Sequence, residues 1–335
     1  MQFENVVGQQ TAKERLHSLL ILFNTQFIIL SGPSGIGKKT MARELVRLML
    51  CPRAAAHEAA TADDCPACRY LEAGSHPDFI SLFPDQPGKV IPVERVRREI
   101  VDDTVTRPQL GERKVYLIDG DGLNEQGQNA MLKTFEEPPP YCFFVLLSAE
   151  PRRLLDTIRS RAALVPLSRS TPDEIRQILK LHLIAENEAT DYIIRYADGV
   201  PGVALDLCRD EWYVEAKSSM IKIIDLLTLP GRSQLLVDGF SIFEENKDRI
   251  NDFLDLLETW FRDLFVWSRT HCIEQLIHRD QVDRIAELSE RSQWTAQTDV
   301  RIFRLIGEVR QALAANGNFE MGVNYLLLQL RKELN

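Results

Sequence analysis

The sequence contains a glycine-rich segment that reads Gly32-Pro33-Ser34-Gly35-Ile36-Gly37-Lys38-Lys39. Its spacing is that of a P-loop up to Lys38. It lies between an apolar run at residues 27–30 and a helical pattern at residues 41–46, which is the strand–loop–helix context that the motif requires. The three glycines let backbone N–H groups approach phosphate oxygens, and the helix N-terminus adds positive potential. The segment therefore predicts a site for ATP or ADP in which Lys38 reaches the terminal phosphates.

The catalytic part of this predicted site is incomplete. Lys39 stands where a Ser or Thr hydroxyl usually binds magnesium, and Thr40 comes one position late, about 100° further around the helix. Asp119 ends an apolar run and fits the carboxylate that holds magnesium, but Gly120 follows where an active ATPase commonly has a glutamate. The sequence thus favours a nucleotide-binding fold more strongly than it favours hydrolysis.

Two polar residues near the same predicted strand ends have two interpretations each. Ser148 ends the next strand, on the side of an open α/β sheet that faces the ligand crevice. It is a candidate for contacting a phosphate or a water, and equally for capping the strand end. Asp121 could stand in for the absent glutamate, but the pair Asp121-Gly122 is more typical of a turn that closes the strand.

The composition is that of a globular protein of two or three domains. The chain has 335 residues, a net charge of −9 and six cysteines. The negative charge argues against a protein that holds DNA by its overall charge, and the cysteine content does not indicate a disulfide scaffold. No apolar run approaches the ~18 residues that a membrane span needs, so we expect no membrane partner and a cytoplasmic location.

The order of the predicted elements gives an α/β domain followed by helices. Residues 1–167 alternate continuous apolar strands with helices, which is typical of a parallel sheet covered on both faces. The strands stop at Ser170, where residues 171–174 read as a helix start with a hydroxyl cap, an early proline and two acids. We therefore predict an α/β P-loop domain over residues 1–167, a three-helix lid over residues 168–210 and an all-α domain over residues 211–335.

Two finer expectations concern the helical regions. The second lid helix is predicted over residues 186–197, and the third from Pro201. Four apolar positions of the last helix either pack against neighbouring proteins or belong to the internal core: Tyr325, Leu326, Leu327 and Leu330.

Four segments resemble motifs of one family. Residues 3–9 (FENVVGQ) are similar to the adenine-side entry of AAA+ ATPases, and residues 124–139 (NEQGQNAMLKTFEEPP) closely resemble a segment of bacterial clamp-loader subunits. Residues 157–162 (TIRSRA) resemble the Ser-Arg-Cys motif of those subunits, and residues 74–78 (GSHPD) resemble a segment just after their zinc knuckle. By this resemblance the chain is identified as a member of the AAA+ clamp-loader family over residues 1–210, with the C-terminal helices as an oligomerisation collar.

The resemblance also implies which type of subunit this is. Motor subunits of the family carry an arginine where this chain has Gly202, which is a third departure besides Lys39 and Gly120. Because phosphoryl transfer depends on positioning and charge neutralisation, three losses around one phosphate favour a largely non-hydrolysing, stator-like subunit. An active ATP-hydrolysing motor subunit is the alternative. A small-molecule kinase is a third reading, which the long helical C-terminal region disfavours.

By the same resemblance, Arg161 is an arginine finger that acts in trans. It would reach the ATP site of a neighbouring motor subunit, where a guanidinium stabilises transition-state charge. Arg159 is a weaker candidate for this role, and Ala162 replaces the usual cysteine. The implied partners are the motor subunits and the delta subunit of a clamp loader. The sliding clamp and primed DNA would be reached through this complex, as part of a replicative DNA polymerase holoenzyme.

A cysteine cluster predicts a structural zinc site in an insertion near residues 51–68. Cys65 and Cys68 form a Cys-x-x-Cys pair that Cys51 could join, and thiolates at this spacing suit tetrahedral zinc. The family pattern has four cysteines, so by resemblance one ligand is missing here, and His57 is the best replacement. The alternative is that the site has decayed and the thiols are free.

Overall fold

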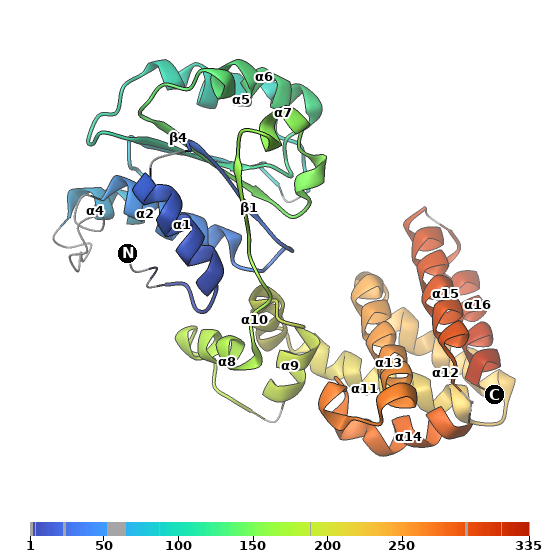
Figure 1. The fold of residues 1–335 in the computed structure, drawn as a ribbon. Helices are drawn as coiled ribbons and strands as arrows, with labels where there is room; N and C mark the ends of the chain where they lie inside the picture. Colours follow the sequence, from blue (N-terminus) through green and yellow to red (C-terminus); the bar gives the residue numbers. More distant parts are fainter. Residues whose placement is uncertain are drawn as a thin grey trace. The chain divides into compact units, whose positions relative to one another are not determined.

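The computed structural model of this chain consists of two compact units, and Figure 1 draws the elements of both. Unit 1 comprises Met1–Leu183 and Gly199–Val203, and unit 2 comprises Ile184–Asp198 and Ala204–Asn335. The structure describes residues 3, 5–22, 25–51, 65–86, 88–187, 189–291, 294–315 and 317–334.

Unit 1 is built on a parallel five-stranded sheet with the strand order β2-β3-β4-β1-β5. The strands are β1 (Phe27–Ser31), β2 (Phe79–Leu82), β3 (Lys114–Asp119), β4 (Cys142–Ser148) and β5 (Ala163–Pro166). Both β1 and β4 are buried along their whole length, because helices cover both faces of the sheet. The order places the carboxyl ends of β3, β4 and β1 side by side. The P-loop, Asp119 and Ser148 therefore meet at one edge.

The helices of unit 1 lie on both sides of this sheet (Figure 1). Successive side chains of β1 point to opposite faces, so Ile28 and Leu30 join one apolar core while Phe27 and Ile29 join the other. The first core includes α1 (Gln10–Leu22), α2 (Lys38–Leu50) and α4 (Pro66–Glu72), and the second includes α5 (Val93–Val96), η2 (Arg97–Val101), α6 (Glu125–Glu136) and α7 (Asp156–Arg159). This arrangement confirms the predicted α/β domain with a parallel sheet covered on both faces.

Three helices follow the sheet, namely α8 (Pro172–Leu181), α9 (Thr190–Tyr196) and α10 (Pro201–Arg209). The start of α8 is a capping box, in which the Glu174 N–H donates to Thr171 Oγ1 and the Thr171 N–H donates to the Glu174 carboxylate. The second helix is shorter than the predicted span of residues 186–197. The Asn187 N–H donates to Thr190 Oγ1, which forms a turn before the helix.

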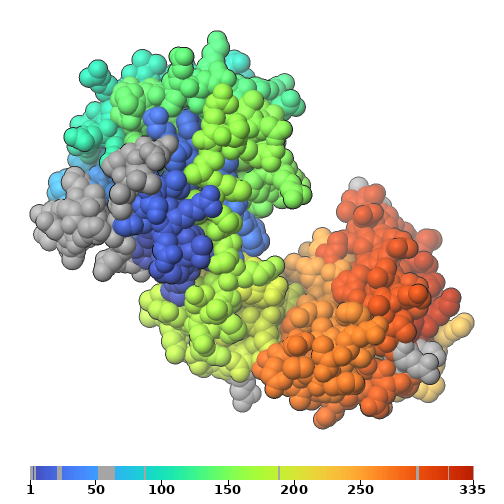
Figure 2. Space-filling view, in the orientation of Figure 1, coloured from blue at the N-terminus to red at the C-terminus, as the bar shows by residue number. Residues whose placement is uncertain are grey.

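All the regular elements among the described residues of unit 2 are helices, and they are drawn from yellow-green to red in the space-filling view (Figure 2). Besides α9 and the part of α10 from Ala204 on, its main helices are α11 (Trp212–Thr228), α12 (Arg232–Glu245), α13 (Ile250–Thr270), α14 (Val282–Arg291), α15 (Ala296–Ala314) and α16 (Phe319–Leu334). Short 3-10 helices occur in both units. Those of unit 1 are η3 (Asp103–Val105) and η4 (Pro151–Arg153), and those of unit 2 are η5 (Lys247–Arg249), η6 (Ile273–Gln275) and η7 (Arg279–Gln281). Among the described helices, none combines the length and the apolar character that crossing a bilayer requires.

The four apolar positions of α16 divide between core and surface. Leu326, Leu327 and Leu330 are fully buried in the core of unit 2, whereas Tyr325 is 48% exposed. The three leucines therefore serve the internal core, and of these four positions only Tyr325 presents its side chain to solvent.

Candidate functional site

The P-loop joins the end of β1 to the start of α2 and has the backbone that its glycines allow. Gly32, Gly35 and Gly37 have φ values of 145°, 79° and 101°, which a residue with a Cβ rarely adopts. Gly37 is in the left-handed region immediately before the first helical residue. The loop therefore turns sharply into the N-terminus of α2, the geometry that presents N–H groups to an anion.

The side chain of Lys38 is folded back onto this loop. Its Nζ donates to the Gly32 carbonyl and, at 3.0 Å, to the Pro33 carbonyl. Burial lowers the pKa of Lys38 from its ordinary value, while the charges of Asp121 and Asp119 oppose this shift. The ammonium is thus held by the protein itself, and a phosphate would have to compete with two carbonyl oxygens for it.

The next two side chains provide no equivalent of the missing hydroxyl in this geometry. The Lys39 Nζ lies 4.7 Å from the ring centroid of Phe83, a cation–π contact. Thr40 is exposed on the first turn of α2, where the Met41 N–H donates to the Gly37 carbonyl at 3.0 Å as in a regular helix. Lys39 therefore offers no hydroxyl at its position, and Thr40 follows it in a first turn that is regular at this point.

Asp121 links the ends of β3 and β4. Its carboxylate accepts the Ser148 hydroxyl and the Ala149 N–H, both at 2.6 Å. Ser148 is fully buried, so its hydroxyl is engaged by Asp121, which favours the capping interpretation over a phosphate contact. Sequence reasoning missed this contact. The contact could have been predicted from the register of β3 and β4, in which Asp119 pairs with Leu147. A single sequence does not reveal that register.

The candidate magnesium carboxylate of Asp119 is half-buried at the end of β3. Burial, and then the charge of Asp121, raise the pKa of Asp119 above its ordinary value, while N–H groups of residues 121 and 122 and the charge of Lys39 act in the opposite direction. The next residue, Gly120, has no room for a side chain. A Cβ there would lie 2.9 Å from the Leu147 carbonyl oxygen, so a glutamate at position 120 requires a shift of β3 or β4.

Arg161 lies at the opposite edge of the sheet, between α7 and β5. Its Nη1 donates to the Thr157 carbonyl at 2.9 Å, and its Nη2 forms an ion pair with Glu136 at 3.5 Å. Ala163 pairs with Ile28, which places Arg161 about six residues, or roughly 20 Å along the strands, from Gly32. The side chain is exposed. By contrast, the guanidinium of Arg159 is paired with Asp156.

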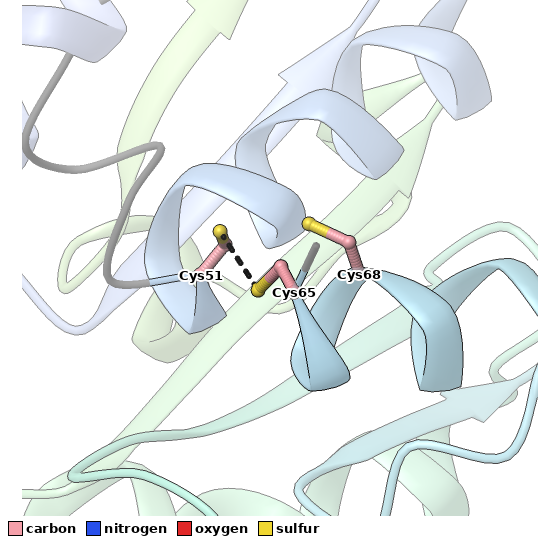
Figure 3. A group of neighbouring side chains, drawn as sticks. All are labelled: Cys51, Cys65 and Cys68. Atoms are coloured by element: carbon pink, nitrogen blue, oxygen red, sulfur yellow. Dashed lines mark hydrogen bonds between the residues drawn. The ribbon is translucent and has the colours of Figure 1, made fainter. Parts of the chain in front are cut away.

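The three predicted thiol ligands come together in unit 1. Cys51 ends α2, Cys65 caps the start of α4, and Cys68 lies in its first turn (Figure 3). Their sulfur atoms all lie within 4.8 Å of one another, with Cys51 and Cys65 at 3.5 Å. Sulfurs that bind one tetrahedral zinc at about 2.3 Å are about 3.8 Å apart. The trio therefore fits zinc, and His57, the predicted fourth ligand, lies outside the described residues.

The thiols of this cluster differ in acidity. Burial raises the pKa of Cys68 to about 12, and the neighbouring Cys51 thiol adds to this shift. Burial also acts to raise the pKa of Cys65, but hydrogen bonds from the Cys68 backbone and the Cys51 thiol outweigh it, so that pKa lies below its ordinary value. A zinc ion would supply the positive charge that three adjacent thiolates need, and it would tie the end of the P-loop helix to α4.

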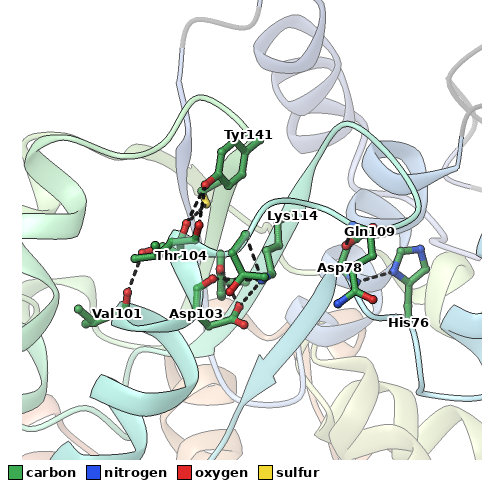
Figure 4. A network of polar contacts seen from close by, with 12 residues as sticks. His76, Asp78, Val101, Asp103, Thr104, Gln109, Lys114 and Tyr141 are labelled. Carbon is green, nitrogen blue, oxygen red and sulfur yellow. Dashed lines mark hydrogen bonds and ion pairs between the residues drawn. The ribbon is translucent and has the colours of Figure 1, made fainter.

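A buried polar network also forms at the amino edge of the sheet, where the motif analysis gave no role to its members (Figure 4). Asp78 is fully buried, and its carboxylate accepts N–H groups of residues 109–111 at 2.6–3.3 Å. Nearby, Lys114 forms a 2.7 Å ion pair with Asp103. Both contacts fix the loop that precedes β3. They give Asp78, in the segment at residues 74–78, a structural role away from the nucleotide site.

Comparisons with known proteins agree with this geometry. A family model described as DNA polymerase III, delta subunit, matches residues 9–171. The DNA polymerase III subunit delta' of Pseudomonas aeruginosa is 39% identical over 45% of this chain and 49% of that protein. The subunit delta' of Escherichia coli is 28% identical over 99% of this chain and 94% of that protein. The subunit tau of Bacillus subtilis is 28% identical over 87% of this chain and 54% of that protein.

A solved structure is also similar to this chain. It is a DNA polymerase III gamma subunit-related protein of Thermotoga maritima, which is 20% identical with a TM-score of 0.46 over 96% of this chain and 99% of that chain. The range matched by the family model includes the P-loop, the segment after Asp119 and the Arg161 region. These matches support the identification of the chain as a DNA polymerase III clamp-loader subunit of the delta-prime type.

Proposed function

We propose that this chain is a largely non-hydrolysing, stator-like subunit of the clamp loader, and that it supplies Arg161 to the ATP site of a neighbouring motor subunit. The observation that carries the proposal is the position of Arg161, roughly 20 Å from the chain's own P-loop along the strands. An exposed guanidinium at that edge cannot reach a phosphate held by Gly32–Lys38. It is available to a nucleotide on another protein, where it would neutralise transition-state charge.

Three features of the chain's own nucleotide site support the absence of hydrolysis. The Lys39 side chain contacts Phe83, so no hydroxyl occupies the magnesium position. Gly120 has no room for a water-orienting glutamate. Gly202, in the first turn of α10, supplies no cation to the phosphates. Because catalysis of phosphoryl transfer consists of positioning and charge neutralisation, these three features together remove most of it.

The proposal also includes the cofactors and partners. ATP or ADP would bind the P-loop without turnover, and zinc would have a structural role at Cys51, Cys65 and Cys68. The motor subunits and the delta subunit would be direct partners in the assembly. The sliding clamp and primed DNA would be engaged through the complex. The cytoplasmic location and the division into domains at residues 167 and 210 remain predictions.

An active motor subunit is the competing function, and one observation favours it. The P-loop keeps its three glycines in phosphate-binding geometry and keeps Lys38 and Asp119 beside it. ATP turnover by the isolated full chain separates the two functions. We expect turnover no higher than that of Lys38→Ala. Robust turnover that Lys38→Ala abolishes would overturn the stator proposal and make this chain a motor with an unusual magnesium site.

A further inference from the structure

The backbone of α10 lies directly on the P-loop in unit 1. The Gly202 N–H donates to the Gly35 carbonyl at 2.9 Å. Both residues belong to unit 1, together with the rest of Gly199–Val203. A direct contact between two glycine backbones brings the first turn of α10 closer to the loop than a side chain at position 202 would permit.

The contact leaves no space for a side chain at position 202. A Cβ built on Gly202 would lie 2.7 Å from Gly35 Cα and 2.9 Å from its carbonyl oxygen, closer than real Cβ atoms approach other atoms. A Cβ on Gly35 would meet Val200 Cγ1 at 3.1 Å. Since both obstacles at Gly202 are backbone atoms of a constrained loop, a substitution at this position must move α10 or the loop.

The turn before α10 is fixed from a second side. The Ser170 N–H donates to the Gly199 carbonyl at 2.8 Å, and a Cβ on Gly199 would lie 2.6 Å from Arg169 Cβ. Val200 is buried and Val203 packs against the same apolar core as α2. The segment is therefore held between the start of the lid and the P-loop by backbone contacts and apolar packing, none of which involves a nucleotide.

We propose that the Gly35–Gly202 contact is a latch that holds the first turn of α10 on the P-loop without nucleotide. The latch rests on the proposed function, in which position 202 carries no phosphate-binding cation. The latch explains why position 202 is a glycine: the contact requires a residue without a Cβ, whereas the loss of the cation alone would allow many other residues. It also implies that an arginine at position 202 separates α10 from the loop instead of restoring a cation to the site.

Hydrogen exchange of the full chain tests the latch. We expect the Gly202 amide to be protected in the wild-type chain without nucleotide, with protection unchanged by Mg-ATP. Gly202→Ala and Gly202→Arg should each lower the protection of residues 199–203 and of the P-loop at least tenfold, because the substituted Cβ breaks the contact. The matched control is Gly307→Ala on α15, where a Cβ meets nothing within 4 Å and protection should be unchanged.

Two results would overturn the latch. One is a Gly202 amide that exchanges in the wild-type chain at the rate of an unstructured peptide, a result that needs no variant to fold. The other is Gly202→Ala with wild-type protection. Circular dichroism of each variant distinguishes local release from global unfolding. ATP turnover by the wild-type chain would refute the proposed function and leave the exchange result to decide the latch separately.

Discussion

Charged side chains at the carboxyl and amino ends of the parallel strands in unit 1 differ in how firmly the chain holds them. These two ends are called the carboxyl edge and the amino edge of the sheet. At the carboxyl edge, Lys38 is held by loop carbonyls and Asp121 is held by Ser148 and the Ala149 N–H. At the amino edge, Arg161 is exposed and has one carbonyl contact and one 3.5 Å ion pair with Glu136. The charged side chains beside the P-loop are thus held within the chain, while the Arg161 guanidinium faces outward.

The difference in burial explains why these contacts differ in strength. An exposed ion pair contributes about 0–1 kcal/mol, so Arg161 can leave Glu136 for a phosphate at little cost. Ser148 is fully buried, and removing the partner of a buried polar group costs about 1–3 kcal/mol. The comparison teaches that the P-loop end of the sheet is held by contacts within the chain, whereas the opposite end leaves an exposed guanidinium that is available to a partner.

The largest expected effect is that of Arg161→Ala in the assembled clamp loader. Loss of a guanidinium that acts in trans should lower ATP turnover by the neighbouring motor subunit by a factor of ~10³–10⁵. Lys38→Ala at the other edge should leave this turnover within about twofold of wild type, since the chain's own site does not contribute. Steady-state ATPase assays of the reconstituted complex measure both variants.

The control for this experiment is Arg159→Ala, because Arg159 lies two residues from Arg161 and is paired with Asp156. Its turnover should remain close to wild type if the effect belongs to Arg161. Gel filtration of each complex shows whether assembly is intact. A strong loss with Lys38→Ala and none with Arg161→Ala would reverse the assignment of the two edges.

The next largest effect concerns the three cysteines at the end of the P-loop helix, which we propose bind zinc. Cys68→Ser should remove the bound metal. Zinc at a thousand times its dissociation constant contributes about 4 kcal/mol to the free energy of unfolding, so the melting temperature should fall by roughly 8–16 °C. Differential scanning calorimetry with and without a chelator measures this shift, and a metal-sensitive dye measures zinc content.

Two further variants sharpen this test. Cys208→Ser is the matched control, because this half-buried thiol lies outside the trio, and its zinc content should equal that of wild type. His57→Ala should weaken zinc binding if the histidine is the fourth ligand. A wild-type chain that is purified without zinc, and whose melting temperature does not respond to added zinc, would favour free thiols.

The sequence was sufficient for the features that depend on neighbouring residues. The glycine spacing of the P-loop, the continuous apolar strands and the start of α8 at Thr171 are local patterns, and each appears where it was expected. The trio of cysteines also comes together as predicted. These features could be predicted because each has a local cause in the sequence. The P-loop turn needs residues that adopt positive φ, and a strand buried on both faces needs a continuous apolar run.

The features that the sequence did not reveal depend on tertiary contacts. The pairing of Asp121 with Ser148 follows from strand register, and the contact of Gly202 with Gly35 follows from the approach of α10 to the loop. On α16 the apolar residues recur at helical spacing, but the spacing does not tell which face meets the core. Three leucines are therefore buried where an exposed face was an equally good interpretation.

A smaller effect is expected from Glu136→Gln at the amino edge. The carboxylate orients the Arg161 guanidinium at 3.5 Å, and an exposed pair of this kind is worth about 1 kcal/mol or less. We expect kcat of the neighbouring motor subunit to fall about two- to fivefold with KM unchanged, because positioning acts on the transition state. The exposed neighbour Glu137 gives the control Glu137→Gln. An increase in kcat would mean that Glu136 withholds Arg161 from the phosphate.

The smallest expected effect is at the carboxyl edge, where Asp119→Asn should stabilise the chain. The pKa of Asp119 is raised by burial and by the charge of Asp121. A carboxyl whose pKa is higher in the folded chain than in the unfolded chain loses stability when it ionises. The cost is therefore present at pH 7, decreases as the pH falls through the folded pKa, and is absent well below the ordinary value of 3.8.

Thermal melts across pH measure the effect of this substitution. At pH 7 the Asn variant should melt roughly 1 °C above wild type, and the difference should disappear in acid. Asp238→Asn, at an exposed position of α12, should show no such pH-dependent gain. If Asp119→Asn instead melts below wild type at pH 7, the carboxylate has favourable partners that outweigh its burial. The carboxyl edge would then be maintained for binding a cation, and the contrast between the two edges would be weaker than we infer.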